Sequence, residues 1–570
     1  MGPALSRHST KVVLVALNAK YSHSSLALRY LKHYLESGHL DLDTLEFNIN
    51  QDPKAILGDL ARRNPDVVGF SCYIWNIELI LPLVSNLRKV CPKTTIILGG
   101  PEVSFDTEYW LRRYPDIDYL IAGEGEEALR SFLEEYGQAQ GSLTPSQLKR
   151  ICGLVYRQGD KVIENPQEQL DLASIPPLYG GDLGDLRNKI VYYETTRGCP
   201  YSCAYCLSSV MGGVRKFPRE RSLEELRRLA EAGVEQVRFV DRTFNYDAKR
   251  AYELLKFMIE LHTPTRFQLE VSGDLLTTEI LELLRTAPEN RFQFEIGVQS
   301  THGDTLDAVS RRTNLKRLAE VVQFLKEKTT VRVLLDLIAG LPEEGFWRFG
   351  QSFDFVYSLK PDRIHLGFLK LLRGSRLRED AESFGCVYTD EAPYEVLGTK
   401  DLSFAELSRL KLIEDLVDKF YGLRFSGSLE YLCKDGSPFH FFNDLAERWE
   451  KAGYHWLNHS LAGLYRILWD LFGTELEHPD LLPWLCHDFR LNEPRKMTPA
   501  WMGGRQDRSL ENHLIQSGRI LQILPELEGL GPREMGRRIF VETLHFQKGT
   551  EQVLFYFPSE RTTARTFRLE

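Results

Sequence analysis

Three cysteines stand close together in one run of the 570-residue chain, Cys199-Pro-Tyr-Ser-Cys203-Ala-Tyr-Cys206. Thiolates are the ligands that iron–sulfur clusters require, and a loop allows several of them to reach one cubane. Because a cubane contains more than three irons, three cysteines leave one iron open to a substrate or cosubstrate. The spacing therefore predicts that Cys199, Cys203 and Cys206 bind a 4Fe–4S cluster with one open iron.

Other uses of the three cysteines fit the chain less well. A structural zinc site needs a closed set of ligands, so Cys152 or a histidine would have to come from a distant part of the chain. A ferredoxin-type cluster requires a further cysteine at a characteristic spacing, which is absent here. An incidental grouping is disfavoured because the chain has only nine cysteines. The open cluster is the favoured interpretation.

The composition is that of a globular protein with several domains. Hydrophobic residues make up 43% and charged residues 26% of the chain, and 570 residues exceed what one hydrophobic core holds. A net charge of -9 disfavours an extended nucleic-acid surface. No apolar run approaches the roughly 20 residues of a membrane helix, and the run at 12–17 is too short for a signal peptide. We therefore expect a cytoplasmic protein with reduced thiols and without membrane or nucleic-acid partners.

Strand-like and helix-like segments alternate from residue 11 to about residue 135. Continuous apolar runs, such as Val-Val-Leu-Val-Ala-Leu at 12–17, are typical of parallel strands that are covered on both faces. The expected strands are 12–17, 67–70, 95–98 and 119–121, and the expected helices are 26–35 and 78–90. Small or polar residues follow these strands. The pattern predicts a doubly wound, Rossmann-like α/β domain over residues 1–139, with ligands beyond the carboxyl ends of its strands.

Residues 140–188 are expected to connect two domains. Segments 153–156 and 161–163 flank Gln158-Gly159-Asp160 and predict a hairpin with a tight turn. Pro176-Pro177 then marks a connector. This stretch is therefore interpreted as a hairpin and linker.

A second series of alternating strands and helices spans residues 189–400. The expected strands are 190–193, 237–240, 267–271, 292–298, 331–338 and 364–369, with helices at 223–232, 247–262, 277–286, 303–327 and 346–359. Such repeats predict a partial (β/α)6 TIM-like barrel, whose active site lies at the carboxyl ends of its strands. Residues 401–570 have a mostly helical pattern and one strand signal at 552–557. We expect a separate, mostly helical C-terminal domain there.

The cysteine motif resembles the signature of the radical S-adenosylmethionine (SAM) superfamily, including the aromatic Tyr205 before the last cysteine. The resemblance implies that the amino and carboxylate groups of SAM bind the open iron. One electron then cleaves SAM reductively and produces a 5′-deoxyadenosyl radical. It also implies a flavodoxin- or ferredoxin-type electron donor and a place for Tyr205 in cofactor binding.

Residues at the ends of the barrel strands are similar to further elements of that superfamily. Gly-Val-Gln-Ser300 is similar to the Gly-x-Gln-Ser element of its cobalamin and methylthiolating branches. The resemblance implies that Ser300 and Arg311 hold the carboxylate of SAM, and pairing of arginine with a carboxylate makes physical sense of that role. It also implies that Asp241 and Glu270 contribute to cofactor binding. Taken singly, residues such as Asp241, Glu270 and Arg311 more often form structural salt bridges, but their recurrence at strand ends favours a role as ligands.

The N-terminal domain lacks both a Gly-x-Gly-x-x-Gly fingerprint after its first strand and a Walker-type phosphate loop. Its strand ends, ahead of a radical barrel, are similar to the cobalamin-binding domain of cobalamin-dependent radical SAM enzymes. The resemblance implies cobalamin contacts at Asn18, Tyr21, Ser71, Tyr73, Gly99, Gly100, Glu102, Glu124 and Gly125. The Asp-x-His-x-x-Gly element that supplies a cobalt ligand in classical cobalamin enzymes is absent. His23 could reach the cobalt, or it could be a capping or surface residue.

The resemblance as a whole implies a class B methyltransferase-like enzyme that methylates an unactivated carbon of a small molecule through methylcobalamin. Residues 401–570 resemble the helical extension of a subfamily without assigned function, with Leu482-Pro-Trp-Leu-Cys-His-Asp488 as its most distinctive run. This extension either caps the barrel mouth or only packs.

Three alternatives stay open beside methylation. One is a cobalamin-dependent radical rearrangement or cyclisation, and another is a non-catalytic iron–sulfur protein. The third, a methylthiolating tRNA enzyme, would need additional cluster cysteines and a basic surface, which Cys72, Cys91 and the net charge of -9 fit poorly.

Overall fold

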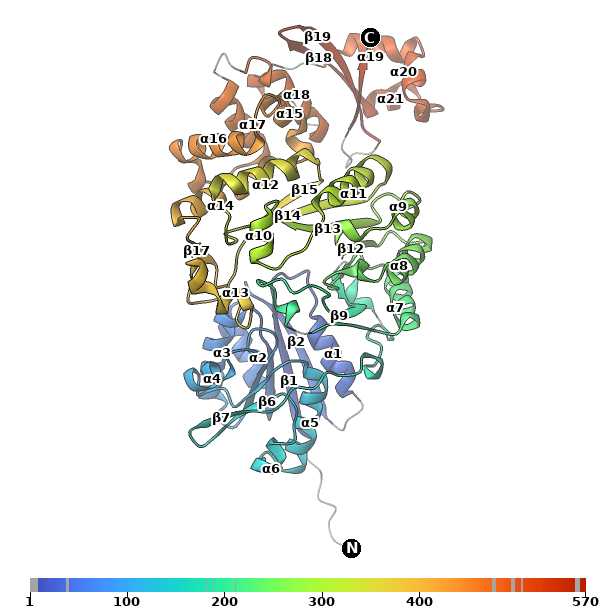
Figure 1. Ribbon diagram of the computed structural model, residues 1–570. Coiled ribbons are helices and arrows are strands. Elements are labelled where there is room, and N and C mark those ends of the chain that lie inside the picture. The colour runs from blue at the N-terminus through green and yellow to red at the C-terminus, as the bar shows by residue number, and fades with distance from the viewer. Residues whose placement is uncertain are drawn as a thin grey trace. The chain divides into compact units, whose positions relative to one another are not determined.

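The computed structural model describes residues 9–36, 40–181, 183–187, 189–210, 212–473, 478–493, 498–503, 506–558 and 564–569 (Figure 1). The chain divides into two compact units. The first comprises Met1–Gly345 and Gly367–Ser403, and the second comprises Phe346–Leu366 and Phe404–Glu570. No helix within these described ranges is long and apolar enough to cross a membrane.

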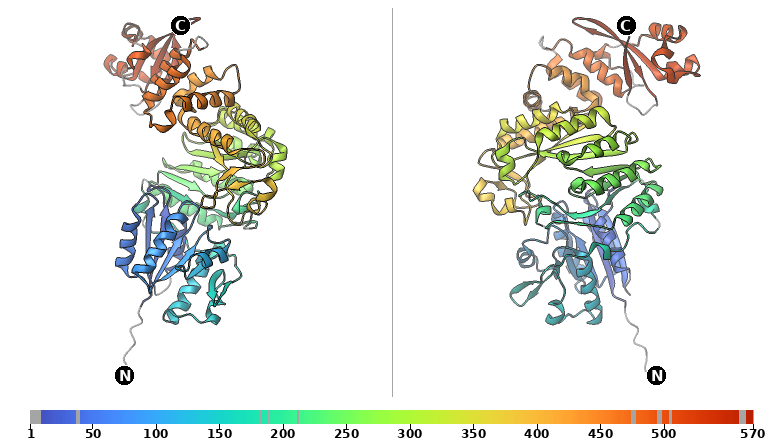
Figure 2. Two further views of the ribbon diagram at one scale, coloured as in Figure 1. Left: turned by 90° about the vertical axis from the view of Figure 1, so that its left-hand side faces the viewer. Right: turned by 45° about the vertical axis from the view of Figure 1, so that its right-hand side comes forward.

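The N-terminal part of the first unit is built on a seven-stranded sheet in the order β2-β1-β3-β4-β5-β6-β7. The strands are β1 (Lys11–Asn18), β2 (Asp41–Asn48), β3 (Val67–Ser71), β4 (Thr95–Gly99), β5 (Tyr119–Ile121), β6 (Leu154–Gln158) and β7 (Lys161–Glu164). β1 to β5 are parallel. The helices are α1 (Leu26–Leu35), α2 (Pro53–Arg63), α3 (Ile77–Val90), α4 (Thr107–Arg113), α5 (Gly125–Gln138) and α6 (Pro145–Leu148). Figure 2 shows helices on both faces of this sheet.

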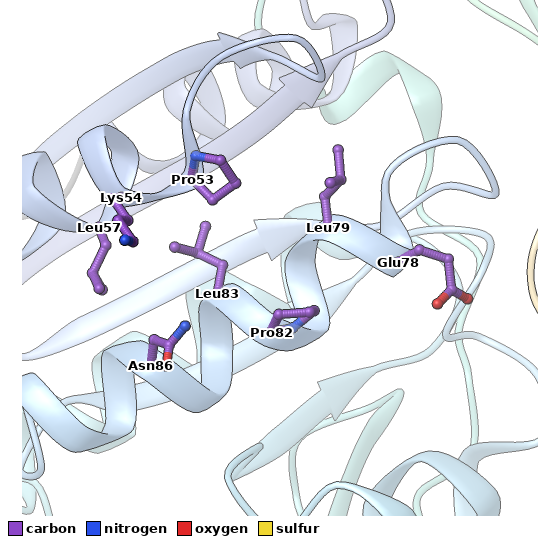
Figure 3. A pocket seen from close by; sticks show the side chains of 8 residues that line it. All are labelled: Pro53, Lys54, Leu57, Glu78, Leu79, Pro82, Leu83 and Asn86. Carbon is purple, nitrogen blue, oxygen red and sulfur yellow. The ribbon is translucent and has the colours of Figure 1, made fainter.

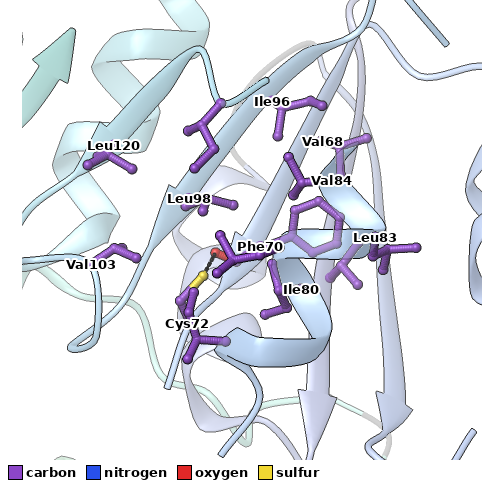
Figure 4. Close-up of a cluster of buried hydrophobic side chains, with 14 of the residues drawn as sticks. Val68, Phe70, Cys72, Ile80, Leu83, Val84, Ile96, Leu98, Val103 and Leu120 are labelled. Atoms are coloured by element: carbon purple, nitrogen blue, oxygen red, sulfur yellow. Dashed lines mark hydrogen bonds between the residues drawn. The ribbon is translucent and has the colours of Figure 1, made fainter. Parts of the chain in front are cut away.

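Both faces of β1 are buried, as its apolar run predicts. Val13 and Val15 point into one hydrophobic cluster, whereas Val12 and Leu14 point into a second one on the opposite face. Figure 4 shows the first cluster around Phe70. The predicted doubly wound sheet is confirmed. The sequence did not reveal β2 or α2, because β2 is a half-exposed edge strand of mixed composition and lacks a continuous apolar run.

The predicted hairpin forms, but it extends the N-terminal sheet instead of serving as a separate linker. β6 pairs antiparallel with β5, and β7 pairs with β6. An unpaired edge of β5 would leave backbone groups open, and the hairpin covers that edge. Pairing across chain segments explains why the sequence pattern alone suggested a connector.

The barrel is a second sheet in the order β15-β14-β13-β12-β11-β8, which confirms the predicted partial barrel. Its strands are β8 (Ile190–Tyr193), β11 (Gln236–Phe239), β12 (Arg266–Glu270), β13 (Phe292–Gln299), β14 (Arg332–Ala339) and β15 (Arg363–Phe368). Its helices are α7 (Arg219–Glu231), α8 (Ala248–Glu260), α9 (Thr278–Leu284), α10 (Gly303–Ala308), α11 (Leu315–Lys328) and α12 (Phe346–Ser358). The helix expected at 303–327 is divided, because Ser310 adopts a left-handed conformation and Asn314 caps a new helix.

Smaller elements complete the first unit. A two-stranded hairpin follows β8, and a short helix and a second hairpin follow β15: β9 (Thr196–Gly198), β10 (Val214–Lys216), α13 (Arg376–Glu379), β16 (Val387–Tyr388) and β17 (Val396–Gly398).

The second unit is mostly helical after residue 404, as expected. Its helices there are α14 (Phe404–Phe420), α15 (Ser426–Leu432), α16 (Pro438–Lys451), α17 (Leu461–Leu468), α18 (Leu481–Asn492), α19 (Arg508–Gln516), α20 (Arg519–Ile523) and α21 (Pro532–Arg538). It also contains an antiparallel sheet of β18 (Ile539–Phe546), β19 (Gly549–Tyr556) and β20 (Arg565–Leu569). The strand signal at 552–557 corresponds to β19. β18 was not predicted, and the fully buried Glu542 interrupts its apolar pattern.

Candidate active site

The three cysteines lie in a loop that β9 and β10 close like a hairpin. We call residues 199–206 the cysteine loop. β9 pairs antiparallel with β10, with Gly198 opposite Val214. Gly198 has a φ of +94°, and a Cβ atom there would overlap the carbonyl oxygen of Gly213. Only glycine therefore allows the hairpin to close directly before Cys199.

The pKa of the Cys199 thiol depends on the other two thiols of the cysteine loop. Cys203 is buried, whereas Cys199 and Cys206 are half-buried. Burial raises the pKa of the Cys199 thiol, and Cys206 and Cys203 raise it further, against hydrogen bonds from the Tyr201 backbone and the Thr243 hydroxyl. The Cys199 thiol therefore lies close enough to the other two thiols for their charge to disfavour its ionised form.

The described residues contain no group of three or more His, Cys, Asp or Glu that could hold a single metal ion. In a cubane, each cysteine binds a different iron, so its sulfur atoms stay apart from one another. The donor set fits such a cluster by its chemistry, and cluster binding by Cys199, Cys203 and Cys206 stays a prediction.

The end of β13 is strained and crowded. Gln299 has a φ of +70°, which is uncommon outside glycine. Its side-chain amide folds back over Gly297, where a Cβ atom would overlap it. Arg311 donates from Nη2 to the Gly297 carbonyl at 2.6 Å, and its Nη1 lies 3.9 Å from the Cys203 sulfur. The strand end thus brings an amide and a guanidinium to the cysteine loop.

Three buried polar atoms of Gln299, of Arg311 and of the residue two positions after it lack a hydrogen-bond partner within the described part of the chain: Gln299 Oε1, Arg311 Nε and Thr313 Oγ1. Each such atom costs about 1–3 kcal/mol when it stays unpaired. A ligand with a carboxylate, an amine and hydroxyl groups, as SAM has, would satisfy them. The donor set fits SAM by its chemistry, and SAM binding by these residues stays a prediction. The analysis of the sequence did not assign Gln299 or Thr313, and the strain at Gln299 has no signal in the sequence.

Two predicted SAM contacts are turned into the protein instead. Ser300 is fully buried and donates to Glu344 at 2.7 Å. Asp241 is fully buried and accepts hydrogen bonds from the Thr195 backbone at 2.8 Å and the Thr196 hydroxyl at 2.8 Å. Burial raises the pKa of Asp241, while these bonds oppose the shift. Both groups hold turns next to the site, because buried polar groups need partners, and their contact with SAM stays a prediction.

Burial shifts the pKa values of two further predicted site residues, Glu270 and Tyr205. Burial raises the pKa of Glu270 to about 7, and the charges of Glu295 and Asp336 raise it further. The charge of Arg242 lowers it. Arg242 lies 4.0 Å from Glu270. Burial likewise raises the pKa of Tyr205, so its phenol is neutral beside Arg311. Glu270 can therefore hold or release a proton near neutral pH.

The predicted cobalamin contacts gather at the carboxyl edge of the N-terminal sheet, because β1, β3, β4 and β5 are parallel. Tyr21 is 84% exposed there. The ring of Tyr73 stacks on Trp75 with centroids 4.2 Å apart. Gly100 has a φ of +106°, and a Cβ atom would lie 2.6 Å from the Cys72 oxygen. This edge has room for an approaching ligand at Tyr21 and close backbone packing at Gly100.

Other residues of this edge have partners within the N-terminal domain. Asn18 donates to Glu46 at 2.8 Å. Ser71 is buried, and its carbonyl accepts from Asn76 at 3.0 Å. Gly99 ends β4, and Gly125 begins α5.

The two glutamates predicted to contact cobalamin bind residues of the chain, and their contact with cobalamin stays a prediction. Glu102 is 2% exposed and accepts from the Tyr394 hydroxyl at 2.5 Å. Glu124 binds Arg215 and accepts from the Leu170 backbone at 3.0 Å. Buried carboxylates require such partners, which the sequence pattern cannot reveal.

His23 also has a protein partner. Its Nδ1 lies 3.1 Å from the Tyr192 hydroxyl, and burial, Lys20 and Arg238 lower its pKa. Neutral imidazole is therefore favoured, and the structure gives His23 a contact with the first barrel strand.

Two surface cavities lie away from these residues. One is a groove between α2 and α3, lined by apolar side chains such as Leu57 and Pro82 (Figure 3). The other lies along α1 and is also lined by Leu178, Gly181 and Leu183. Neither contains a predicted site residue.

Three families match successive parts of the chain. Residues 12–133 match the B12 binding domain, residues 193–356 match the radical SAM superfamily, and residues 382–555 match a family of unknown function, DUF4080. These ranges agree with the order of domains in the structure.

The chain is also similar to individual methyltransferases over part of its length. The chain is 26% identical to the cobalamin-dependent radical SAM methyltransferase TokK of Streptomyces tokunonensis, over 60% of this chain and 52% of TokK. It is 28% identical to the 2-(S-pantetheinyl)-carbapenam-3-carboxylate methyltransferase of Streptantibioticus cattleyicolor, again over 60% of this chain and 52% of that protein. The chain thus spans about half the length of these relatives.

The fold resembles that of the cobalamin-dependent SAM radical enzyme OxsB, solved with aqua-cobalamin and SAM. The TM-score is 0.59 at 15% identity, over 86% of this chain and 82% of OxsB. The chain therefore carries a B12-binding domain, a domain of the radical SAM superfamily and a DUF4080 domain, in that order.

Proposed function

We propose that this chain is a cobalamin-dependent radical SAM enzyme that transfers a methyl group to an unactivated carbon of a small molecule. The observation that carries the proposal is the direct connection between the cysteine loop and the carboxyl edge of the N-terminal sheet. Arg197 precedes Cys199 by two residues and donates to Glu126, next to the start of α5, at 2.6 Å. Two cofactors held by these regions would face one space.

The residues of the chain divide the work. Cys199, Cys203 and Cys206 would hold the cluster, while Gln299 and Arg311 would hold SAM. The Arg311 guanidinium stays protonated and is suited to pair with the SAM carboxylate. When bound, the cluster supplies the electron that cleaves SAM, and cobalamin carries the methyl group.

The edge of the N-terminal sheet would hold cobalamin through backbone and aromatic contacts. Gly99 and Gly100 present backbone at the end of β4, and Tyr21 and Tyr73 offer aromatic surface. His23 pairs with Tyr192, which supports cobalamin binding without a histidine ligand.

A reducing cytoplasmic setting and a flavodoxin- or ferredoxin-type electron donor belong to the same proposal. All nine cysteines are free thiols, which supports a compartment that keeps thiols reduced. The small-molecule substrate is the remaining partner.

Anaerobic reconstitution with iron, sulfide and cobalamin tests the proposal without a known substrate. The loaded chain, given SAM and a strong reductant, should release 5′-deoxyadenosine, and methylation of reduced cobalamin should release S-adenosylhomocysteine. Release of 5′-deoxyadenosine alone would instead support radical rearrangement or cyclisation. A fully loaded cluster without any cleavage of SAM would refute the enzyme assignment.

A further inference from the structure

Arg197, whose side chain is nearly buried, connects the beginning of the cysteine loop to the N-terminal domain. Arg197 donates to Glu126 at 2.6 Å and to Glu194 at 2.9 Å, and it lies 3.2 Å from Glu124. The side chains of these four residues are at most 11% exposed. The guanidinium also lies over the Tyr30 ring, 5.0 Å from its centroid.

Charge at this place is nearly balanced. Arg215, on the strand that returns from the cysteine loop, binds Glu124 and donates to the Leu170 carbonyl at 2.8 Å. Glu194 and Glu126 raise the pKa of Arg197 against the effect of burial, so it stays protonated. The beginning of the loop and the returning strand are thus both tied to the turn that follows β5.

A second buried arginine lies in the segment after β15. Arg373 is 7% exposed and donates to Asp106 at 2.7 Å and to the Tyr394 hydroxyl at 2.9 Å. The same Tyr394 hydroxyl donates to Glu102 at 2.5 Å. Glu102 and Asp106 both belong to the loop after β4. At the next residue, Gly374, a Cβ atom would overlap the Phe105 ring, so this segment packs directly on that loop.

The same segment reaches the cysteine loop a few residues later. The Leu377 backbone donates to the carbonyl of Ala204 at 2.9 Å. Ala204 stands between Cys203 and Tyr205, and its own backbone donates to Val309 at 2.9 Å. Residues 373–377 therefore connect the loop after β4 with the centre of the cysteine loop.

We propose that Arg197 and Arg373 are positioning residues that hold the beginning and the centre of the cysteine loop against the carboxyl edge of the N-terminal sheet. The inference rests on the proposed function insofar as these two attachments set the separation of two cofactors. Buried ion pairs contribute little net stability when compared with apolar packing, but removal of one partner leaves a buried charge and releases the geometry. An arginine fork with several partners suits this purpose, because it fixes direction as well as charge.

Hydrogen–deuterium exchange of the cysteine loop tests the positioning role in the full chain without any cofactor. R197Q and R373Q should each accelerate exchange of backbone amides in residues 199–206 by about tenfold. R197K should restore part of the protection, because it returns the charge without the fork. D106N, at a half-exposed partner of Arg373, is a milder variant for the case that R373Q does not fold.

R88Q is the matched control, because Arg88 pairs with Asp118 at 2.6 Å within the N-terminal sheet and its helices. It should leave exchange of the cysteine loop unchanged. Exchange in R197Q and R373Q equal to that in R88Q would overturn the proposal.

Spectroscopy of the loaded protein separates this inference from the proposed function. R197Q and R373Q should bind iron and corrin with affinities within about threefold of the parent, while the cluster's electron paramagnetic resonance signal broadens. A parent chain that cleaves no SAM would refute the proposed function and leave the exchange result standing. An active parent with unchanged loop exchange in both variants would refute the positioning role alone.

Discussion

Buried charges serve different purposes in the two units of the molecule. In the second unit, Asp488 is fully buried and accepts hydrogen bonds from the Ser428 backbone at 2.8 Å and from the Ser428 hydroxyl at 2.7 Å. Arg490, on the same helix, pairs with Glu542 of β18 at 3.4 Å and lies over Phe540. These contacts join neighbouring elements of one core.

In the first unit, two arginines whose side chains are at most 11% exposed connect the barrel region with the N-terminal sheet. Arg197 binds Glu126 in the first turn of α5, and Arg373 binds Asp106 from the loop after β4. Burial of a charge therefore does not mark a functional site by itself. A buried charge marks a functional site when it lies at the carboxyl ends of parallel strands, beside cysteines and unpaired polar atoms. The contacts of Asp488 also give the distinctive run at 482–488 a packing role.

The largest expected effect separates a cysteine of the site from a cysteine of the core. C203A should lose the cluster and with it all measurable reductive cleavage of SAM, because the loop retains only two thiols. C486A, at a buried cysteine of the second unit, should keep full cluster content. Iron and sulfide analysis with quantification of 5′-deoxyadenosine checks both. Equal iron content in the two variants would mean that the cluster lies elsewhere.

The next effect concerns stability in the second unit. D488A should lower the free energy of unfolding by about 2–4 kcal/mol, because it leaves buried donors of residues 427 and 428 unpaired. D435A, at an exposed aspartate, should change it little. Urea denaturation followed by circular dichroism measures the difference. If Asp488 only packs, SAM cleavage per loaded cluster stays unchanged in D488A under conditions in which the protein is folded, and a selective loss of cleavage would contradict this.

The third effect is the pH dependence of the free energy of unfolding that arises from two glutamates at the edge of the N-terminal sheet. Burial raises the pKa of Glu102 to about 7, and the charge of Glu78 raises it further. The hydrogen bond from Tyr394 and the charges of Arg373 and Arg378 oppose this rise. A raised pKa stabilises the folded state at low pH, and this contribution is lost as the pH rises through 7. Relative to E102Q, the parent should therefore lose about 2 kcal/mol of unfolding free energy between pH 5.5 and pH 8.

Glu124 provides the opposite sign as a control. Burial would raise its pKa, but hydrogen bonds from Arg215 and the charge of Arg197 hold it below the usual value. Its contribution to stability is present at neutral pH and should be lost only as the pH falls below about 4.5. Urea denaturation of parent, E102Q and E124Q across this range measures both. A parallel pH dependence of the parent and E102Q would contradict the buried position of Glu102.

The smallest effect concerns one hydroxyl group. T313V should weaken SAM binding by about fivefold, because the buried Thr313 hydroxyl is available to a ligand. The free energy of unfolding should not fall, since valine removes an unpaired group. T330V is the control, because the Thr330 hydroxyl already donates to the Ala287 carbonyl at 3.1 Å. Unchanged SAM affinity in T313V, measured by calorimetry, would remove Thr313 from the site.

The sequence predicts features that depend on local pattern. Continuous apolar runs indicate β1, β3 and β4, because parallel strands with two covered faces must be apolar throughout. The spacing of Cys199, Cys203 and Cys206 indicates the cluster loop, because the ligand type and the loop are both local.

Features that depend on distant partners could not be predicted. Glu102 and Tyr394 are separated by 292 positions in the chain, so the sequence placed Glu102 at a strand end without its partner. Arg373 and Asp106 are similarly remote. The backbone strain at Gln299 arises from packing over Gly297, which no residue type announces. The edge strand β2 was missed for a related reason, because its mixed composition reflects its place at the edge of the sheet.

The central claim is that the cysteine loop holds a cluster that faces cobalamin at the edge of the N-terminal sheet. Both the reduced cluster and cob(II)alamin carry an unpaired electron, so dipolar electron paramagnetic resonance measures their separation in the loaded chain. We expect a single narrow distance between the cluster and cob(II)alamin in the parent, and a broader distribution of this distance in R197Q. Two independent signals without dipolar coupling, in a chain that contains both cofactors, would contradict it.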